Sequence, residues 1–234
     1  MSKTIGIIGG MGPLAGADLL EKIIRVTEAK TDGEHIPVFL HSNTAIPDRT
    51  AAILSNGPSP VKEIVRSALA LESVGAEVLA MACNTAHYFY EEITAFLHVE
   101  LIHMPRETAL AAADMGYKKA ALLATDGTAR SGVYTRAFED TGVSLLLPDG
   151  GGQAAVMDMI YRGVKAGASV WDTRAVLAAM RRLGDLGAEL FILGCTELPI
   201  AFTRFGIEAK TLDPTMVLAK KAVVCAGGKL KDAD

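Results

Sequence analysis

The sequence predicts an α/β fold made of two similar halves, each a doubly wound (Rossmann-like) parallel sheet covered by helices. Three observations lead to this prediction. Short runs that are apolar throughout alternate with longer amphipathic segments, which is typical of parallel strands buried on both faces. Half of the 234 residues are hydrophobic, which is enough for a sizeable core. The stretch VGAEVLAMACNT also aligns without gaps with LGAELFILGCTE, which indicates an internal repeat.

The predicted elements alternate along the whole chain. The apolar runs that we expect to form strands are residues 4–9, 36–41, 77–82, 101–103, 120–124, 143–146 and 189–193. The amphipathic stretches that we expect to form helices are residues 15–29, 61–74, 86–97, 106–115, 132–140, 154–164, 169–186 and 214–225. A strand followed by a helix, repeated in this way, predicts parallel pairing.

The repeat also predicts the domain boundaries. Its best-aligned stretches are offset by 112 positions (195 − 83), and the segments near residues 3 and 118 align loosely at about the same offset. We expect an N-terminal domain of residues 1–103 and a C-terminal domain of residues 104–208. The last helix is expected to return to the first half, so residues 209–234 join the N-terminal domain. A pseudo-twofold duplication of this kind predicts an active site in the cleft between the halves.

The composition argues against several classes of function. The net charge of −4 and the isoelectric point near 5.8 give no polycationic surface, so we expect no nucleic-acid partner. No apolar run approaches the ~20 residues of a membrane span, and the N-terminal segment has the pattern of a buried strand rather than of a signal peptide. Three cysteines in an acidic chain predict reduced thiols and a cytoplasmic protein.

Cys83 and Cys195 occupy equivalent positions in the repeat, each at the carboxyl end of a predicted strand. Ligands of open parallel sheets bind outside that end. If the halves face each other, the two thiols would lie on opposite sides of the ligand. Inverting the α-carbon of an amino acid needs two such groups, one to remove a proton and one to return it. A thiol suits this task because its ordinary pKa of ~8.5 can be tuned toward neutrality.

Inert packing is the alternative for each cysteine, because cysteine is among the most buried residue types. The equivalent positions of Cys83 and Cys195, each followed by hydroxyl or amide residues, favour a shared chemical role. Cys225, on an apolar helix face, is interpreted as packing. His87 lies one helical turn after Cys83, but no second pair of residues is spaced for zinc, so we predict no metal site.

Five motifs occur in the order IGIIGGMGP, IPDRT, MACNTAH, RGVKAG and LGCTEL, and together they resemble the aspartate/glutamate racemase family, more closely its aspartate racemase branch. The resemblance covers nearly the whole chain. It implies racemisation of L- and D-aspartate by two bases, Cys83 and Cys195, without pyridoxal phosphate or another cofactor. By analogy, Cys83 acts on the D-enantiomer and Cys195 on the L-enantiomer. The resemblance also implies a homodimer.

The resemblance further implies that Arg49, in the loop after the second strand, and Lys165, in a loop between glycines, bind substrate carboxylates. An arginine can hold a carboxylate with two parallel hydrogen bonds. A solvated surface cation is the alternative for both. Glu197, next but one to Cys195, could keep that cysteine protonated, since a nearby anion raises a thiol pKa. The candidates for substrate binding, each with a turn or capping role as its alternative, are Met11, Gly12, Asn84, Thr85, Thr128, Thr196 and Glu197.

Other functions fit parts of the sequence. Residues 10–15 match the dinucleotide fingerprint, but the second strand ends in HSN without the acidic residue that would hold a ribose. Two further alternatives remain. One is a cysteine-dependent decarboxylase or isomerase of the same fold, and the other is an amino-acid binding protein without activity. Glutamate racemases typically have Asp-Ser after the first strand and Thr-His after the second cysteine. The residues here, GGM and TE, favour aspartate over glutamate, and a broad amino-acid range is the remaining alternative.

Overall fold

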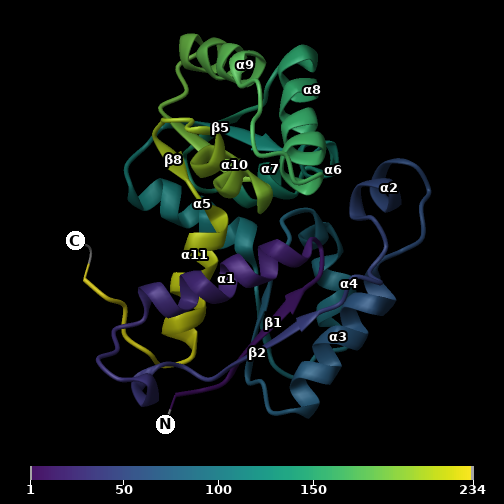
Figure 1. The fold of residues 1–234 in the computed structure, drawn as a ribbon, viewed down its shortest axis with the longest axis vertical. Coiled ribbons are helices and arrows are strands. Elements are labelled where there is room, and N and C mark those ends of the chain that lie inside the picture. The colour runs from purple at the N-terminus through teal and green to yellow at the C-terminus, as the bar shows by residue number, and fades with distance from the viewer. Residues whose placement is uncertain (1, 233–234) are drawn as a thin grey trace. The chain divides into compact units, whose positions relative to one another are not determined.

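The structure is a computed structural model that describes residues 2–232, and it divides into two compact units (Figure 1). Unit 1 comprises Met1–Met104 and Thr215–Asp234, and unit 2 comprises Pro105–Pro214. Each unit contains one four-stranded parallel sheet, with the strand orders β2-β1-β3-β4 and β6-β5-β7-β8. The two orders are equivalent, as a duplication predicts. The predicted α/β class with two parallel sheets is therefore confirmed.

Unit 1 has a hydrophobic cluster on each face of its sheet. Its strands are β1 (Ile5–Gly9), β2 (Val38–Ser42), β3 (Val78–Met81) and β4 (Glu100–Ile102). Its helices are α1 (Pro13–Val26), η1 (Asp32–Glu34), α2 (Arg49–Leu54), α3 (Val61–Ser73), η2 (Thr85–Phe89), α4 (Tyr90–Thr94) and α11 (Pro214–Cys225). Successive side chains of a strand point to opposite faces. Ile7 therefore packs with α1 and α11, whereas Ile8 packs with α3 and η2.

Unit 2 repeats this plan around β5 (Lys119–Ala124) and β7 (Leu190–Gly194). The outer strands are β6 (Ser144–Leu146) and β8 (Thr211–Leu212). The helices are α5 (Met104–Asp114), which starts at the boundary, α6 (Asp126–Ser131), α7 (Val133–Phe138), α8 (Gly150–Asp158), η3 (Met159–Lys165), α9 (Arg174–Asp185) and α10 (Glu197–Phe205). Leu123 packs with η3 and α10 on one face, and Leu122 packs with α5 and α7 on the other.

The structure contains short elements that the sequence pattern does not predict, namely η1, α2, α6, α10 and β8. Six residues, the length of α2 and of α6, are too few for helical periodicity to be visible. Pro199 interrupts the helical pattern of α10, although proline is tolerated in the first turn of a helix. The predicted helix 86–97 is instead the 3₁₀-helix η2 followed by α4. The predicted helix 154–164 ends as a π-helix, η3.

We expect Gly10→Ala to lower the free energy of unfolding by at least about 2 kcal/mol, through backbone strain and steric overlap together. Gly10 has φ +94°, and a Cβ there would overlap the backbone of Asn43. Gly75 is the matched control, because it has φ +99° with no neighbouring atom within 4 Å of an added Cβ. Gly75→Ala should cost only the conformational part, about 1–2 kcal/mol, in denaturant unfolding. Equal losses in the two variants would contradict the proposed overlap with Asn43.

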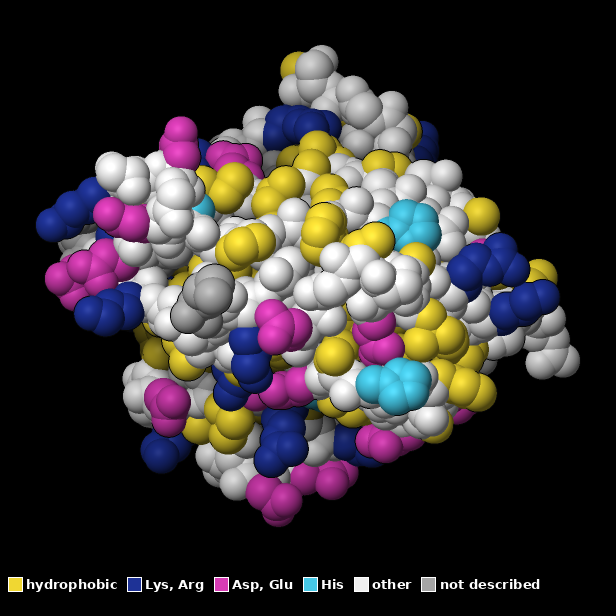
Figure 2. Space-filling model, turned by 90° about the horizontal axis from the view of Figure 1, so that it is seen from below, with side chains coloured by type: hydrophobic (Ala, Val, Ile, Leu, Met, Phe, Trp, Pro, Cys, Tyr) yellow, Lys and Arg dark blue, Asp and Glu magenta, His cyan; other side chains and the backbone are white. Residues whose placement is uncertain are grey.

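No helix in residues 2–232 combines the length and the apolar character that a bilayer crossing requires. Figure 2 shows acidic, basic and hydrophobic side chains interspersed on the face that it draws. That face therefore has no extended area of a single charge, in agreement with the modest net charge of −4.

Candidate active site

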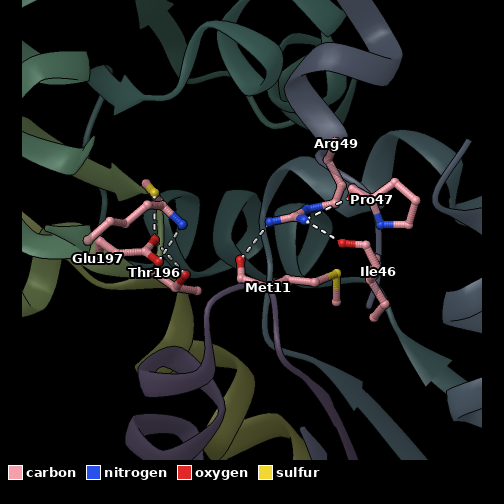
Figure 3. A network of polar contacts seen from close by, with 8 residues as sticks. Met11, Ile46, Pro47, Arg49, Thr196 and Glu197 are labelled. Carbon is pink, nitrogen blue, oxygen red and sulfur yellow. Dashed lines mark hydrogen bonds and ion pairs between the residues drawn. The ribbon is translucent and has the colours of Figure 1, made fainter. Parts of the chain in front are cut away.

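A buried carboxylate, Glu197, connects three other predicted site residues in unit 2 (Figure 3). The Cys195 thiol donates a hydrogen bond to Oε2 of Glu197 (Sγ···Oε2 3.0 Å), and the Thr196 hydroxyl donates to the same oxygen (3.1 Å). The Lys165 ammonium forms an ion pair with the other oxygen (Nζ···Oε1 2.9 Å). One carboxylate thus accepts from a thiol, a hydroxyl and an ammonium group.

The turn from β7 into α10 places Cys195. The strand ends at Gly194, where an added Cβ would overlap the end of the Leu122 side chain in β5, so a larger residue there would require Leu122 to move. The Cys195 carbonyl accepts a hydrogen bond from the Leu198 amide (2.9 Å). Thr196 occupies the N-cap position, but its side chain does not cap the helix and binds Glu197 instead. The predicted capping alternative for Thr196 is therefore wrong.

The charge balance of this cluster favours a neutral thiol at Cys195. Burial raises the pKa of Cys195 well above its usual value, and the charge and hydrogen bond of Glu197 raise it further, against the opposing effect of Lys165. Burial would also raise the pKa of Glu197, but the Lys165 charge and the hydrogen bonds from its neighbours outweigh burial, so this pKa is lowered. The charges of Glu197 and Lys165 cancel, whereas a thiolate would add an uncompensated buried charge.

Lys165 is the last residue of the π-helix η3, and not part of a loop as the flanking glycines predict. π-Helical turns are rare in proteins, and those that occur are often found at functional sites. Its ammonium group lies 5.6 Å from the centre of the Tyr161 ring, and its side chain remains 27% exposed. Lys165 therefore combines a buried ionic partner with partial access to solvent.

Cys83 lies in unit 1, two residues beyond the end of β3, and is 5% exposed. Its amide donates to the Met81 carbonyl (2.8 Å), and the buried residues Asn84 and Thr85 lead directly into η2. Asn84 takes the N-cap position of η2 without a side-chain capping bond. The repeat aligns Thr85 with Glu197 (197 − 112 = 85), so a neutral residue occupies the place where unit 2 has its carboxylate.

Arg49 is the first residue of α2, and not in the loop where the sequence pattern puts it. Asp48 caps this helix by accepting from the Ala51 amide (2.7 Å). The Arg49 guanidinium donates to the carbonyls of Pro47 (2.9 Å) and Met11 (2.9 Å), with a longer contact to Ile46 (3.4 Å) (Figure 3). Arg49 therefore ties the turn between β1 and α1 to the segment that precedes α2.

The other candidates lie at the ends of the inner strands. Met11 is buried, and Gly12 is the N-cap of α1. Thr128 is buried in α6, where its amide donates to the Thr125 side chain that caps the helix (3.3 Å), and the two hydroxyls lie 3.1 Å apart. This contact places Thr128 in a capping cluster, the alternative role that its sequence position predicts. The structure joins Met11 with Arg49, and Lys165, Cys195 and Thr196 with Glu197.

The sequence pattern missed two polar side chains beside these strand ends. Gln153 donates to the Ala124 carbonyl (2.9 Å) and to Asp126 (2.8 Å), and so fixes the turn after β5. His87, considered only as a metal ligand, is hydrogen-bonded to the Cys83 carbonyl (2.8 Å). No local sequence signal distinguishes either role. The described part of the chain contains no group of three or more His, Cys, Asp or Glu side chains that could hold a metal ion.

The family model described as Asp/Glu/Hydantoin racemase matches residues 8–222. The chain belongs to this racemase family. Among solved structures, the Picrophilus torridus aspartate racemase is 31% identical with a TM-score of 0.83, over 98% of this chain and 96% of that one. The broad specificity amino-acid racemase RacX of Bacillus subtilis is 27% identical over 225 residues, 94% of this chain and 96% of RacX.

A more distant solved structure agrees in fold. The glutamate racemase of Francisella tularensis, solved with D-glutamate, has a TM-score of 0.70 at 16% identity, over 95% of this chain and 80% of that one. The family match confirms the resemblance that the five motifs predict, and it supports racemase chemistry on an amino acid. The two relatives with higher identity differ in specificity, since one is named an aspartate racemase and the other a broad specificity amino-acid racemase.

Proposed function

We propose that this chain is an amino-acid racemase that interconverts L- and D-aspartate with Cys83 and Cys195 as its two acid–base groups, without a cofactor. The observation that carries the proposal is the hydrogen bond from Cys195 to Glu197 (Sγ···Oε2 3.0 Å). A thiol held protonated by a buried carboxylate is equipped to donate a proton. Its counterpart in the repeat, Cys83, follows the equivalent strand and has neutral Thr85 in place of that carboxylate. Such an asymmetric pair supplies one acid and one base.

The proposed steps conserve protons. The Cys83 thiolate removes the α-proton of D-aspartate, and the Cys195 thiol delivers its proton to the other face of the same carbon. The product is L-aspartate, with Cys83 now the thiol and Cys195 the thiolate. The reverse reaction starts from that state. Glu197 affects the free-energy difference between these two protonation states, because its charge disfavours the Cys195 thiolate.

Lys165 and Arg49 are the proposed carboxylate-binding cations. When a substrate carboxylate approaches, Lys165 can release Oε1 of Glu197 and bind the substrate, since its side chain is 27% exposed. Arg49 supports the turn at Met11 through its backbone contacts and adds positive charge there. The likeness to the Picrophilus aspartate racemase, over 98% of this chain, supports aspartate as the substrate.

A broad amino-acid range is the second candidate. The guanidinium of Arg49 donates to backbone carbonyls, and Lys165 is paired with Glu197. Both cations therefore already have partners within the protein, and neither is a dedicated binding group for the side-chain carboxylate of a substrate. The match to RacX over 94% of this chain also favours this alternative.

Proton NMR of L-aspartate with the purified protein in D₂O tests the proposal, together with chiral chromatography and L-glutamate and L-alanine as comparisons. We expect loss of the α-proton signal while D-aspartate accumulates, with no added cofactor. Exchange of several amino acids at similar rates would replace the aspartate assignment by broad specificity. If no amino acid exchanges its α-proton in a reduced, folded sample, racemase activity is excluded and decarboxylase and isomerase substrates come next.

We expect Lys165→Met to lower kcat/KM for aspartate by about tenfold, which is the loss of one charge-assisted hydrogen bond. The loss of kcat/KM should be smaller for an amino acid with an uncharged side chain, because its only carboxylate is the α-carboxylate. Arg162→Met is the matched control, since Arg162 lies in the same π-helix with its side chain 74% exposed. Steady-state racemisation of both substrates measures the difference. An equal loss on both would assign Lys165 to the α-carboxylate or to Glu197 alone.

The homodimer that the resemblance implies stays a prediction. Light scattering of the purified protein at several concentrations tests it, and a mass of 24.6 kDa throughout would show a monomer.

A further inference from the structure

We infer that His87 is a positioning residue for Cys83, whose neutral ring holds the Cys83 carbonyl and ties it to the first amide of α5. Nδ1 of His87 lies 2.8 Å from the Cys83 carbonyl, and Nε2 lies 3.2 Å from the Met104 amide. The inference rests on the proposed function in so far as Cys83 is the base. It concerns a side chain that the racemase proposal itself does not use.

The partners of His87 fix its tautomer. The Met104 amide is a donor, so Nε2 must be the acceptor and carry no proton. The ring proton then resides on Nδ1, which donates to the Cys83 carbonyl. The 3.4 Å contact between Nε2 and the Ile102 carbonyl joins two acceptors and is not a hydrogen bond in this tautomer. Burial, assisted by the charge of His103, lowers the pKa of His87 to about 3, so the ring is neutral throughout the working range of an enzyme.

The Cys83 carbonyl needs a partner because of the local helix geometry. In an α-helix, the amide of residue 87 would donate to this carbonyl. In η2, the His87 amide donates to Asn84 instead (3.1 Å), and the His87 side chain binds the Cys83 carbonyl. A buried carbonyl without a partner costs free energy comparable to a lost hydrogen bond. The side chain thus completes the turn that carries the proposed base.

In unit 2, the carbonyl of the equivalent cysteine has a different hydrogen-bond partner. The Cys195 carbonyl accepts from the Leu198 amide (2.9 Å), which is a backbone contact. The repeat aligns His87 with Pro199 (199 − 112 = 87), a residue that has no side-chain donor. The histidine contact is therefore particular to Cys83 and is not a general requirement of the fold.

The His87 ring is enclosed by aromatic neighbours. The ring is buried, packs parallel to Tyr90 (6.4 Å between centres, 10° between planes) and meets His103 edge to face (5.4 Å). The Tyr90 hydroxyl donates to the Leu101 carbonyl in β4 (2.7 Å). His87 thus connects the Cys83 backbone to the end of β4 and the start of α5. A fixed carbonyl fixes the Cα–Cβ direction of Cys83, and small errors in that direction slow proton transfer steeply.

Two substitutions separate positioning from general stability. His87→Asn retains a donor at the place of Nδ1, whereas His87→Leu retains the volume and removes both hydrogen bonds. We expect His87→Leu to lower kcat about 10- to 100-fold with KM little changed, and His87→Asn to restore most of it. Rates of iodoacetamide labelling, followed by peptide mass spectrometry, should change at Cys83 and stay constant at Cys195 and Cys225 in the same molecules.

Equal changes of labelling at all three cysteines in the His87→Leu variant would show a loss of stability and overturn the inference. An unchanged kcat would do the same. Two-bond ¹H–¹⁵N correlation spectra of histidine-labelled protein, with His87 assigned from the variant, should show the Nδ1–H tautomer, and the Nε2–H tautomer would contradict it. Labelling and tautomer remain measurable if the wild type racemises nothing, so failure of the proposed function is distinguishable from failure of this inference.

Discussion

Replacing Cys83 or Cys195 with serine is expected to slow aspartate racemisation by about 10²- to 10⁴-fold in either direction, the range that general acid–base groups contribute. A serine hydroxyl keeps the size of the thiol, but it is a far weaker acid and cannot become the anion near neutral pH. Both directions slow in each variant, because every turnover uses one group as base and the other as acid. Chiral chromatography of D- and L-aspartate measures both rates.

Cys225→Ser is the matched control, because Cys225 is the remaining cysteine and packs beside the α1–α11 core of unit 1. This variant should racemise at the wild-type rate. The two-thiol proposal fails if Cys83→Ser or Cys195→Ser retains more than about one tenth of the activity in a folded sample. If only one of them loses activity, a single-base reaction such as decarboxylation becomes the better explanation, and release of carbon dioxide from malonates would be tested next.

The two sheets are predictable from the sequence because their strands are short, apolar and separated by helices. The runs around Ile7 and Leu122 are apolar throughout, which is typical of strands in a parallel sheet that is buried on both faces. The gapless repeat then gives both sheets the same strand order. The short helices are less predictable, since an element such as α2 depends on the Asp48 cap and on the contacts of Arg49 with Met11, a residue distant in sequence.

The site is predictable as a set of residues but not as a network. The cysteines can be found from the repeat, and Glu197 from its spacing to Cys195. The pairing of Lys165 with Glu197 joins residues 32 positions apart (197 − 165) through the π-helix η3, and no sequence period signals a π-helix. Similarly, His87 has the sequence spacing of a second metal ligand, and its buried contacts to Cys83 and Met104, on which the positioning role that we infer for it depends, have no signal in the sequence.

Replacing Glu197 with glutamine should slow racemisation about 100-fold at neutral pH and change its pH dependence. Glutamine has nearly the same shape but no charge, so it removes the anion that raises the pKa of Cys195. Lys165 then keeps its positive charge without its carboxylate partner, and a nearby cation lowers a thiol pKa. The balance between the two thiols is lost, because Cys195 becomes a poorer proton reservoir in the resting protein.

The sign of the pH effect follows from these charges. In the wild type, Cys195 stays protonated to high pH, because burial and Glu197 both raise its pKa. In Glu197→Gln, the thiol ionises at lower pH, so the alkaline limb of kcat/KM for D-aspartate moves toward neutrality. Alkylation of Cys195 by iodoacetamide should also begin at lower pH, as peptide mapping across a pH series can measure.

Glu208→Gln is the control, because this substitution removes the same charge from the protein. Glu208 is an exposed acid that follows shortly after α10 in the sequence. Its pH profile should coincide with that of the wild type. An alkaline limb that stays in place or moves to higher pH in Glu197→Gln would exclude Glu197 as the group that keeps Cys195 protonated. Burial alone would then have to hold the proton on Cys195, and the observed hydrogen bond from its thiol to Glu197 would only orient the side chain.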